Sequence, residues 1–387
     1  MGRFSEESSL LIKVSIVILN YNNWEDTLDC VESLLRLDYG SFSIIVCDNA
    51  SSDQSLDQIK SWARKKCDNF SSIHQTKKTE RLSAETTSKY LLPRSIPSEN
   101  LFPEYLRFIP LTILENVENF GFAGGVNEGI RVALDDSELS YVWILNNDTI
   151  VDNKALKHLV IKGESERDIG LCGSTLLYWH EKSLVQALGG FEYNKYLGAS
   201  RQLGHLSHWD SERTSSNFEQ DIERIMDGVQ GASVFVRRSF LETIGLMSEE
   251  YFLFFEEQDW AVRGQKKFSL GYASQSIVYH KEGRTTHANT YSQNEKDYFI
   301  EFCLIRSRFM FTKKFYAHLF PIVYLSQIAL VFKRLLQGNI LNSLFIACTI
   351  LFFGLFYLRR SQKRNALIEY HELIKRMDRY LLGIKFQ

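Results

Sequence analysis

Apolar runs that stop abruptly at polar side chains recur in the first half of the chain. Residues 14–19, 43–47 and 141–145 are each long enough for a strand, and the last run is apolar enough to be buried on both faces. Helical spacing of apolar residues follows the first two runs, over residues 24–35 and 54–65. Polar residues stand directly after the three strand-like runs: Asn20, Tyr21 and Asn22; Asp48 and Asn49; and Asn146, Asn147 and Asp148.

This alternation predicts an α/β fold with a mostly parallel, Rossmann-like sheet flanked by helices. Because the carboxyl ends of parallel strands meet at one edge of a sheet, we expect the polar loops to lie together beside Asp148. A lone carboxylate at such an edge suits a magnesium-like ion that completes its shell with substrate phosphates. The same residues would equally suit an ordinary strand followed by an Asx turn.

Glycines gather where the next helix is expected to begin. A short strand at residues 111–114 is followed by a helix that ends near Leu134, and four glycines stand at its mouth: Gly121, Gly124, Gly125 and Gly129. Glycine lets the backbone approach a ligand closely, and a helix N-terminus favours a diphosphate. The spacing matches neither the dinucleotide-binding fingerprint nor the Walker loop, which disfavours nicotinamide or ATP as the ligand.

Residues 69–110 lack this periodicity and consist largely of Ser, Thr, Lys and Pro with scattered apolar residues. The segment is too long for an ordinary connection between elements. It is therefore predicted to be a variable insertion, either a mobile flap over the site or, as the composition favours, a disordered excursion.

Acidic residues and one histidine supply the candidate chemistry of the second half. Glu256, Glu257 and Asp259 follow an aromatic run, and desolvation by such neighbours raises carboxyl pKa values enough to make a general base. They would also suit the first turn of a helix, where acids complement the helix dipole. His280 follows a strand-like run at residues 276–279, a position where a lone histidine is more often structural than a ligand.

Composition limits the class of protein and its compartment. With 387 residues, 44% hydrophobic, the chain can bury a full core, and its net charge of −2 gives no basic field for nucleic acid. The six cysteines form no C-x-x-C pair, which favours reduced thiols. The N-terminus has acids before its first apolar residues and no cleavage site, so we expect no signal peptide and a cytoplasmic catalytic part.

The C-terminal region changes character. Residues 315–332 and 340–358 are strongly apolar, 18 and 19 residues long, and are flanked by Lys333, Arg334, Arg359, Arg360, Lys363 and Arg364. Length permits a membrane span, and the basic flanks suit anionic headgroups on the cytoplasmic face. The first stretch, which contains polar residues, is predicted to lie in the interface, and the second is the better spanning candidate. The alternative is a buried helical pair packed on the catalytic domain.

Four motifs in order resemble the inverting family-two glycosyltransferases with the GT-A fold. They are VSIVILNYN at residues 14–22, VCDNASSD at 46–53, NFGFAGGVNEG at 119–129 and WILNNDT at 143–149. Within that family the sequence most resembles rhamnosyltransferase-like enzymes of bacterial cell-surface polysaccharide synthesis. The resemblance implies a GT-A domain over residues 12–310, with a helical, membrane-associating region over residues 311–387.

The resemblance also implies roles for individual residues. Asp48 resembles the nucleobase-contacting acid, and residues 146–148 stand in place of the family's D-x-D, of which only Asp148 matches a metal ligand. His280 resembles the histidine that completes the metal site, and Glu257 falls on the base position with Asp259 as the second choice. The implied donor-binding residues are Asn20, Tyr21, Asn22, Asp48, Asn49, Asn119, Gly121, Gly124, Asn127, Asn146 and Asn147.

The expected partners follow from the same resemblance. The donor is expected to be a dTDP- or UDP-linked sugar, with Mg²⁺ or Mn²⁺ as the cofactor. The acceptor is expected to be a glycan or a polyprenyl-diphosphate-linked glycan met at the inner face of the cell membrane. Two alternatives remain: a nucleotidyltransferase acting on a sugar phosphate, and a sugar-binding scaffold that has lost catalysis because the first D-x-D aspartate is absent.

Overall fold

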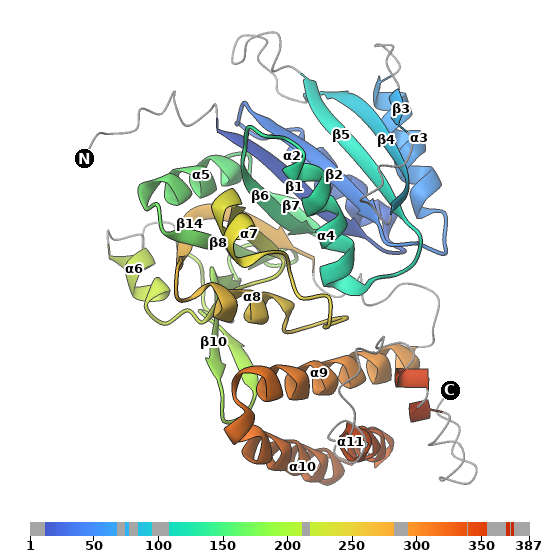
Figure 1. Cartoon of the computed structure of the whole chain (residues 1–387), viewed down its shortest axis with the longest axis vertical. Coiled ribbons are helices and arrows are strands. Elements are labelled where there is room, and N and C mark those ends of the chain that lie inside the picture. Colours follow the sequence, from blue (N-terminus) through green and yellow to red (C-terminus); the bar gives the residue numbers. More distant parts are fainter. Residues whose placement is uncertain are drawn as a thin grey trace.

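One large sheet with helices on both faces forms the body of the protein (Figure 1). The computed structural model describes residues 12–67, 74–76, 84–94, 108–210, 217–281, 293–338, 340–353, 369–371 and 373–374. Within these residues the large sheet has eleven strands, in the order β3-β4-β5-β2-β1-β6-β13-β8-β14-β7, with β9 paired to β8. The predicted α/β architecture is confirmed.

The first half of the sheet is parallel, as the strand and helix alternation predicts. Asn20 of β1 stands opposite Asp48 of β2, and Leu19 of β1 stands opposite Asn146 of β6, so the three strands end at the same edge. The elements of this half are β1 (Lys13–Asn20), α2 (Trp24–Leu34), β2 (Phe42–Asp48), α3 (Ser55–Cys67), β5 (Phe108–Asn116), α4 (Gly121–Leu134) and β6 (Leu139–Asn146).

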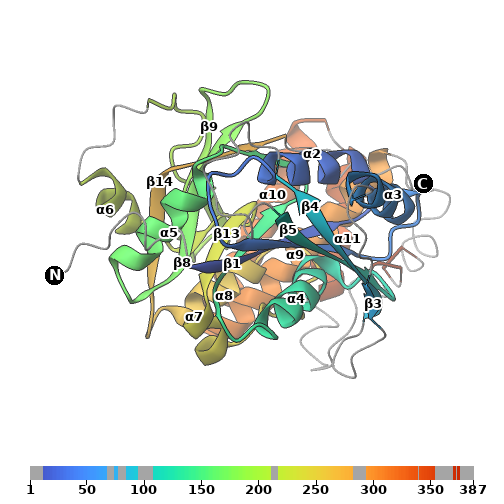
Figure 2. The ribbon, with the colours of Figure 1, turned by 90° about the horizontal axis from the view of Figure 1, so that it is seen from above.

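Alternating side chains of the strands build two cores, one on each face of the sheet. In β1, Val14, Ile16 and Ile18 point to the core under α2, α3 and α5. Val17 points to the other core, under α4, α7 and α8. Figure 2 shows the helices on the two sides of the sheet seen edge on. Burial on both faces explains why these strands are continuous apolar runs.

Part of the predicted insertion at residues 69–110 is ordered sheet. β4 (Ala84–Pro93) pairs antiparallel with β5, and β3 (His74–Thr76) pairs with β4. Tyr90 and Leu92 are buried while Leu91 is exposed, which is the alternation of a strand with one buried face. These three residues stand in a polar stretch and are too few for the sequence alone to show this alternation. The prediction of a wholly disordered excursion is therefore wrong for β4; residues 68–73, 77–83 and 95–107 lie outside the described part of the chain.

The second half adds strands of mixed direction. β13 runs antiparallel between β6 and β8, whereas β14 is parallel to β8. The elements are β7 (Thr149–Val151), α5 (Ala155–Ser165), β8 (Ile169–Tyr178), β9 (Val185–Leu188), α6 (Phe218–Glu223), β13 (Ser233–Arg237), α7 (Arg238–Ile244), α8 (Glu256–Gly264) and β14 (Ser269–His280). A small second sheet, in the order β11-β10-β12, consists of β10 (Gly190–Asn194), β11 (Ala199–Gln202) and β12 (Gly228–Val229).

A helical layer lies at the end of the molecule away from the N-terminal half of the sheet (Figure 1). It consists of α9 (Gln293–Phe315), η4 (Ala317–Leu319), α10 (Phe320–Leu336) and α11 (Ile340–Phe352), which share a core of their own. The predicted domain boundary between residues 310 and 311 falls inside α9, a helix without a break. The helical unit therefore begins earlier than predicted, because α9 carries part of the core that α10 and α11 cover.

The turn into α4 allows a test of how glycine shapes the fold. A Cβ on Gly121, which has φ +72°, would overlap backbone and side-chain atoms of Phe252, whereas a Cβ on Gly245, which has φ +86°, would meet nothing within 4 Å. Gly245→Ala is expected to cost about 1–2 kcal/mol of unfolding free energy from the left-handed backbone alone. Gly121→Ala is expected to cost about 2 kcal/mol more because of the overlap. Urea unfolding of both variants measures the difference, and equal costs would contradict the packing described.

Candidate functional site

The loops after β1 and β2 are joined by a buried hydrogen-bond network. Asn20 Nδ2 donates to Asp48 Oδ1 at 2.7 Å and to Ser51 Oγ at 3.1 Å. The hydroxyl and the backbone N–H of Ser51 donate to the Asp48 carboxylate at 2.6 and 3.0 Å. Burial raises the pKa of Asp48, and these donors oppose the rise. Both carboxylate oxygens of Asp48 therefore accept hydrogen bonds from the loops, and a contact with a nucleobase would have to share one of these oxygens.

Asn22 also holds the two loops together. Its backbone is left-handed at φ +53°, and its Oδ1 accepts from the backbone N–H of Ser52 at 2.7 Å. Tyr21, between these two committed asparagines, keeps a partly exposed side chain. Of the residues predicted to bind donor in the first loop, Tyr21 is therefore the best placed to meet a ligand.

The glycine segment at the start of α4 serves contacts within the protein. Asn49 Nδ2 donates to Asn119 Oδ1 at 2.8 Å and to the Gly121 carbonyl at 3.1 Å. A Cβ on Gly121 would overlap Phe252, and one on Gly124 would overlap Phe120. Phe252 and Phe120 thus pack against these glycines, and the approach of a ligand to them stays a prediction.

Two further contacts complete the enclosure of α4. The Phe122 N–H, in the first turn of the helix, donates to the Phe252 carbonyl at 2.9 Å, so a protein carbonyl stands where the sequence predicts a diphosphate. Buried Asn127 donates to the Met247 carbonyl at 3.0 Å and to Glu249 Oε1 at 2.8 Å. Asn127 thus fixes the segment that precedes α8, and its predicted role in donor binding stays a prediction.

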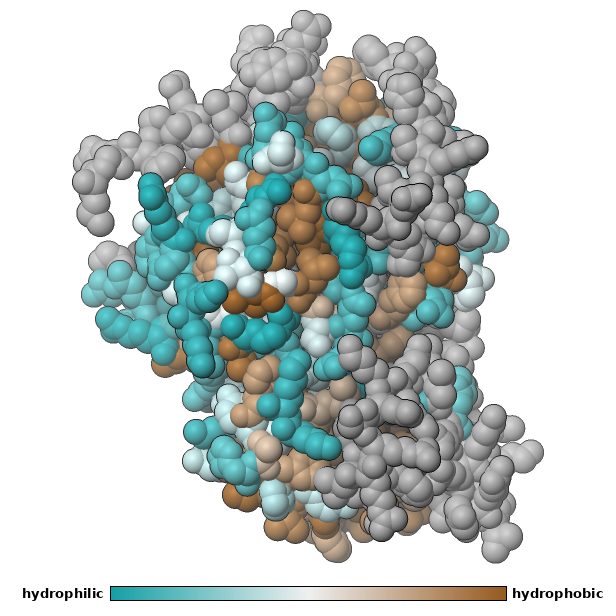
Figure 3. Space-filling view, viewed as in Figure 1, coloured by the Kyte–Doolittle hydropathy of each residue, from teal (hydrophilic) through white to brown (hydrophobic). Residues whose placement is uncertain are grey.

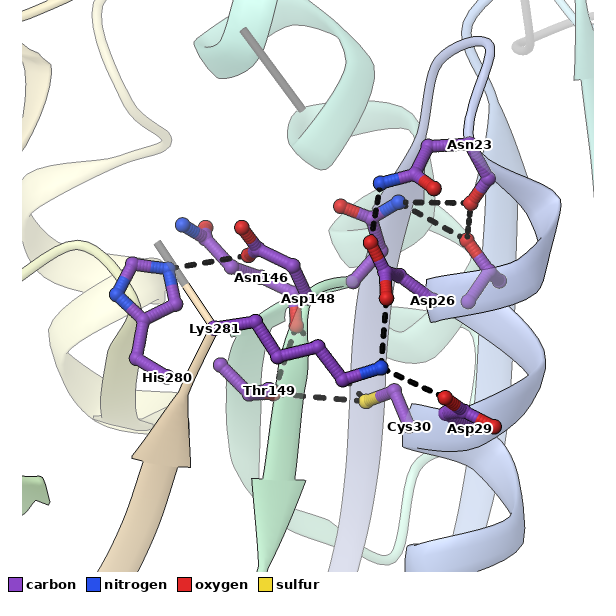
Figure 4. Close-up of polar contacts among 11 residues, drawn as sticks. Asn23, Asp26, Asp29, Cys30, Asn146, Asp148, Thr149, His280 and Lys281 are labelled. Atoms are coloured by element: carbon purple, nitrogen blue, oxygen red, sulfur yellow. Dashed lines mark hydrogen bonds and ion pairs between the residues drawn. The ribbon is translucent and has the colours of Figure 1, made fainter. Parts of the chain in front are cut away.

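Asp148 and His280 meet at the sheet edge, as Figure 4 shows. His280 Nε2 lies 3.0 Å from Asp148 Oδ1, and both side chains are buried. On its other side, His280 Nδ1 lies 2.9 Å from Gln186 Oε1. With the Gln186 amide in this orientation its oxygen accepts from Nδ1–H, which leaves Nε2 to meet the carboxylate. Two acceptors at this distance require a cation between them, either a proton or a metal ion.

The pair has the chemistry of a metal site with two protein ligands. Mg²⁺ binds its ligands at about 2.0–2.1 Å, so neighbouring ligands of an octahedral ion lie about 3 Å apart, the separation seen between Nε2 and Oδ1. Gln186 supplies the outer-shell acceptor that fixes the tautomer of a ligating histidine. No group of three or more His, Cys, Asp or Glu side chains within the described part of the chain is placed to hold a metal.

The two asparagines before Asp148 differ in what they do. Buried Asn147 donates to the Asn23 carbonyl at 3.2 Å and to Thr27 Oγ1 at 3.0 Å, which attaches β6 to the start of α2. Asn146 remains partly exposed, and its side chain lies beside Asp148 (Figure 4). Asn146 is therefore the member of this pair that can contact a ligand, while Asn147 holds the framework.

Lys281 closes the edge behind the Asp148 and His280 pair. Its Nζ lies 2.6 Å from Asp26 Oδ1 and 2.6 Å from Asp29 Oδ2, and its N–H donates to the Asp148 carbonyl at 2.9 Å. The lysine thereby joins the end of β14 to α2, the helix that also receives Asn147. Sequence reasoning missed Lys281, Asp26 and Gln186, although Lys281 is adjacent to His280 and could have been singled out on that ground.

Glu257 lies in the first turn of α8, close to the same edge. The Glu257 carboxylate packs directly against Gly231, where a Cβ would overlap it. The next residue, Ala232, accepts a hydrogen bond at its carbonyl from the Asn146 N–H at 3.1 Å, which connects Glu257 to the end of β6. Glu257 keeps a partly exposed surface in densely packed surroundings, and this desolvation raises its pKa to about 7. Buried Glu256 beside it has its pKa raised well above the ordinary value, by burial and then by the charge of Glu257. A carboxyl group poised near neutrality suits a general base.

Asp259 is committed elsewhere. Its buried carboxylate accepts from Arg263 Nε and Lys314 Nζ, both at 2.6 Å, and from the Tyr251 hydroxyl at 3.2 Å. Arg263 pairs with it within α8, and Lys314 binds it to α9. The geometry therefore favours Glu257 over Asp259 as the base.

Comparison with known proteins gives one family. The sequence matches Glycosyl transferase family 2 over residues 15–85 and 98–239. A search of curated proteins returns no match.

Several solved structures are similar to this chain at low sequence identity and low TM-score. S. aureus TarS 1–349 is 14% identical with a TM-score of 0.42, covering 83% of this chain and 80% of that one. The mannosyltransferase PcManGT from Pyrobaculum calidifontis, solved with GDP-Man and Mn²⁺, is 12% identical with a TM-score of 0.45, covering 97% and 88%. Likeness of this degree carries no information about donor, metal or acceptor.

The Lys281 contacts predict a specific loss of stability. Lys281→Met would leave Asp26, which is 1% exposed, as a buried carboxylate without its cation, and is expected to lower the unfolding free energy by about 3 kcal/mol. Asp29→Asn is the matched control, because Asp29 is 61% exposed and its loss should cost under about 1 kcal/mol. Adding Asp26→Asn to Lys281→Met should recover part of the loss in a denaturant titration. Equal effects of Lys281→Met and Asp29→Asn would contradict the assigned role.

Proposed function

The chain belongs to glycosyl transferase family 2, whose model matches two blocks of 71 and 142 residues out of 387. We propose that it transfers a hexose from a nucleotide-diphosphate sugar to an acceptor hydroxyl, with inversion at the anomeric carbon. The sheet of the confirmed α/β fold is arranged as in the GT-A type. The single observation that carries the proposal is the placing of Glu257, with a pKa near 7, at the same sheet edge as the Asp148 and His280 pair.

The chemistry assigned to the chain itself is proton removal. Ionised Glu257 accepts the proton of the acceptor hydroxyl, and the oxygen forms a bond to the anomeric carbon of the donor. The bond between that carbon and the diphosphate oxygen breaks, so the nucleoside diphosphate leaves with the electron pair. Attack on the face opposite the leaving group inverts the anomeric configuration. The products are the glycosylated acceptor, the nucleoside diphosphate and protonated Glu257, which water in the site deprotonates.

Asp148 and His280 are the residues that would hold a divalent metal such as Mg²⁺ or Mn²⁺. When bound, such an ion supplies positive charge to the leaving diphosphate. Gln186 keeps the Nε2 lone pair of His280 directed at the site by accepting from Nδ1. Lys281 keeps the end of β14 against α2, so that the two ligands remain within reach of one another.

The donor and the sugar rest on the family motifs. We infer a dTDP- or UDP-linked donor and a rhamnose-like hexose, because the motif sequence most resembles the rhamnosyltransferase-like branch. Tyr21 and Asn146 support a donor at this edge, since both keep exposed surface among otherwise committed polar residues. Asp48 anchors the loop that a nucleobase would touch.

The acceptor is inferred to be a glycan, free or linked to polyprenyl diphosphate, and the protein to work in the cytoplasm at the inner face of the cell membrane. Support for this location comes from the C-terminal helices. One helical stretch in the described part of the chain, Ala317–Leu336, is long and apolar enough to cross a membrane, and only 17% of it is buried. The second predicted stretch is a shorter helix as far as it is described, and residues 354–358 lie outside the described part.

One assay separates this function from its two alternatives. The protein is incubated with UDP- and dTDP-linked hexoses and Mn²⁺, and the products are separated by chromatography. Glycosyl transfer, or slow hydrolysis without acceptor, releases nucleoside diphosphate and sugar. A nucleotidyltransferase would produce or consume pyrophosphate, and an inactive scaffold would release nothing. Glu257 and His280, both placed at the edge, favour the first outcome.

Two substitutions should separate donor binding from transfer. Asp148→Ala is expected to abolish metal-dependent binding of the nucleotide sugar, because it removes a ligand of the ion. Glu257→Gln is expected to keep the donor affinity within about three-fold and to lower kcat by about 10² to 10⁴, the range for loss of a general base. Isothermal titration with Mn²⁺ and a transfer assay measure the two quantities. Turnover near that of the wild type in Glu257→Gln would remove the base from this residue.

The raised pKa of Glu257 predicts the pH dependence of the reaction. The base must be ionised to act, so kcat/KM should rise with pH up to about 7 and level off above it. Glu256→Gln should leave the midpoint of this rise in place. Desolvation raises the pKa of Glu257, with no contribution from the charge of Glu256, and glutamine at position 256 keeps the packing that causes this desolvation. A profile that is flat between pH 5 and 8 would contradict the assignment.

A further inference from the structure

The outer face of α10 carries an apolar stripe that no other described part of the chain covers. Exposed apolar side chains follow one another at spacings of three and four residues: Ile322, Leu325, Ala329, Phe332 and Leu336. Val323 and Gln327, on the opposite side of the helix, are buried. The inner side of the helix packs Val323, Ile328 and Val331 on the helical core, so α10 is apolar on both sides and its outer apolar side is not used to cover a core.

The stripe belongs to a larger apolar end of the molecule. Ten of the sixteen large hydrophobic side chains that are exposed in the described residues lie on α10, on α11 or at the tip of the β10–β11 hairpin. Figure 3 shows apolar residues along the bottom edge, where Figure 1 places α10 and α11. Contiguous apolar surface of this kind marks an interaction site.

The hairpin tip lies beside α10 and is attached to it. Tyr196 and Leu197 at the tip are each 52% exposed, and Lys195 lies over the Tyr196 ring at 5.5 Å. Ser326 Oγ of α10 is 3.5 Å from the Leu197 carbonyl, and a Cβ on Gly198 would touch Val323 of α10. Figure 1 shows the hairpin reaching from the sheet to the helical layer.

Arg308 of α9 makes the hairpin tip and α10 one rigid unit. Its Nε donates to the Gly198 carbonyl at 2.7 Å, and its guanidinium also donates to Gln327 Oε1. Both contacts are buried. The tip and the stripe therefore keep a fixed position relative to each other and to the active-site sheet.

Charge selects the partner of this surface. Exposed lysines adjoin the apolar residues in the chain, Lys333 next to Phe332 on α10 and Lys195 next to Tyr196 at the hairpin tip. In the sequence, residues 302–368 contain ten Lys and Arg and no Asp or Glu. A second copy docking by the same face would bring two basic segments together, which is unfavourable. Anionic lipid headgroups over an apolar layer match both properties of the surface.

We propose that the α10 stripe and the hairpin tip form one membrane-docking surface, which lies in the interface of an anionic bilayer and sets the orientation of the active-site edge above it. Tyr196 suits the headgroup level, where an aromatic ring with a polar end is favourable. Spanning by α10 would require its inner face to leave α9 and the hairpin, breaking the Arg308 contacts and the 3.1 Å ion pair between Arg334 and Glu301. The surface is independent of the proposed transfer reaction.

Co-sedimentation of the full chain with vesicles tests the proposal. The protein is expected to bind vesicles of phosphatidylglycerol and phosphatidylethanolamine, to bind neutral phosphatidylcholine vesicles at least about ten-fold more weakly, and to be released by high salt. The hairpin variant Tyr196→Ser/Leu197→Ser and the helix variant Leu325→Ser/Phe332→Ser should each weaken binding about ten-fold. Ile161→Ser/Ile225→Ser, which changes residues 41% and 50% exposed on or next to α5 and α6, is the matched control and should bind as the wild type.

A second measurement reports on the tip alone. Tryptophan emission of Tyr196→Trp should shift to the blue on addition of anionic vesicles by more than that of the wild type, because the new indole leaves water. Transfer to a soluble acceptor should stay within about two-fold in every surface variant, so a failed transfer assay contradicts the proposed function and leaves this proposal standing.

Three results would overturn the proposal. The first is absence of binding to anionic vesicles by the full-length protein. The second is normal binding by the hairpin variant together with an unshifted Tyr196→Trp, which would leave the helix as the sole contact. The third is a concentration-dependent dimer in sedimentation velocity that the helix variant abolishes, which would make a second copy the occupant.

Discussion

Parallel pairing of strands far apart in the sequence is the constraint on which the candidate site depends. β1 fixes the end of β6 beside it and β8 fixes the end of β14, and the antiparallel pairing of β14 with β7 sets His280 opposite Thr149. Asp148 and His280, 132 residues apart, therefore meet at 3.0 Å. The antiparallel β13 between these two pairs presents Ala232 to Asn146 and Gly231 to Glu257. A strand packed on both faces cannot slip in register without displacing its apolar side chains from the core. Packing of the core therefore fixes the positions of the site residues at the strand ends.

Buried carboxylates surround this edge, and each is compensated in a different way. Asp48 has hydroxyl, amide and N–H donors, Asp26 has the Lys281 ammonium, and Asp259 has Arg263 and Lys314. Glu257 has neither a cation nor a donor from another side chain in the described part of the chain, and its pKa rises to about 7 as a result. The carboxylates with side-chain partners hold elements of the fold together, whereas Glu257 can exchange a proton near neutral pH.

Much of the fold and part of the site could be predicted from the sequence. Continuous apolar runs ending in Asn20, Asp48 and Asn146 give the parallel sheet and its polar edge, because burial and strand direction are local properties of the pattern. The roles of Gly121 and Asn127 could not be predicted, since what fills the space beside them, Phe252 and Met247, is about 120 residues away or more. Gln186 and Lys281 carry no motif, and the outward apolar face of α10 looks the same in sequence as an inward one.

The central claim is that this edge binds a nucleotide-diphosphate sugar through a cation shared by Asp148 and His280. Thermal unfolding with a panel of UDP-, dTDP- and GDP-linked sugars, with and without Mn²⁺, tests it most directly, because a ligand that binds only the native state raises its melting temperature. The account predicts that at least one nucleotide sugar raises the melting temperature with Mn²⁺ and not with chelator, and that Asp148→Ala loses the rise. A rise that is the same without metal and persists in Asp148→Ala, or no rise with any sugar, would contradict it.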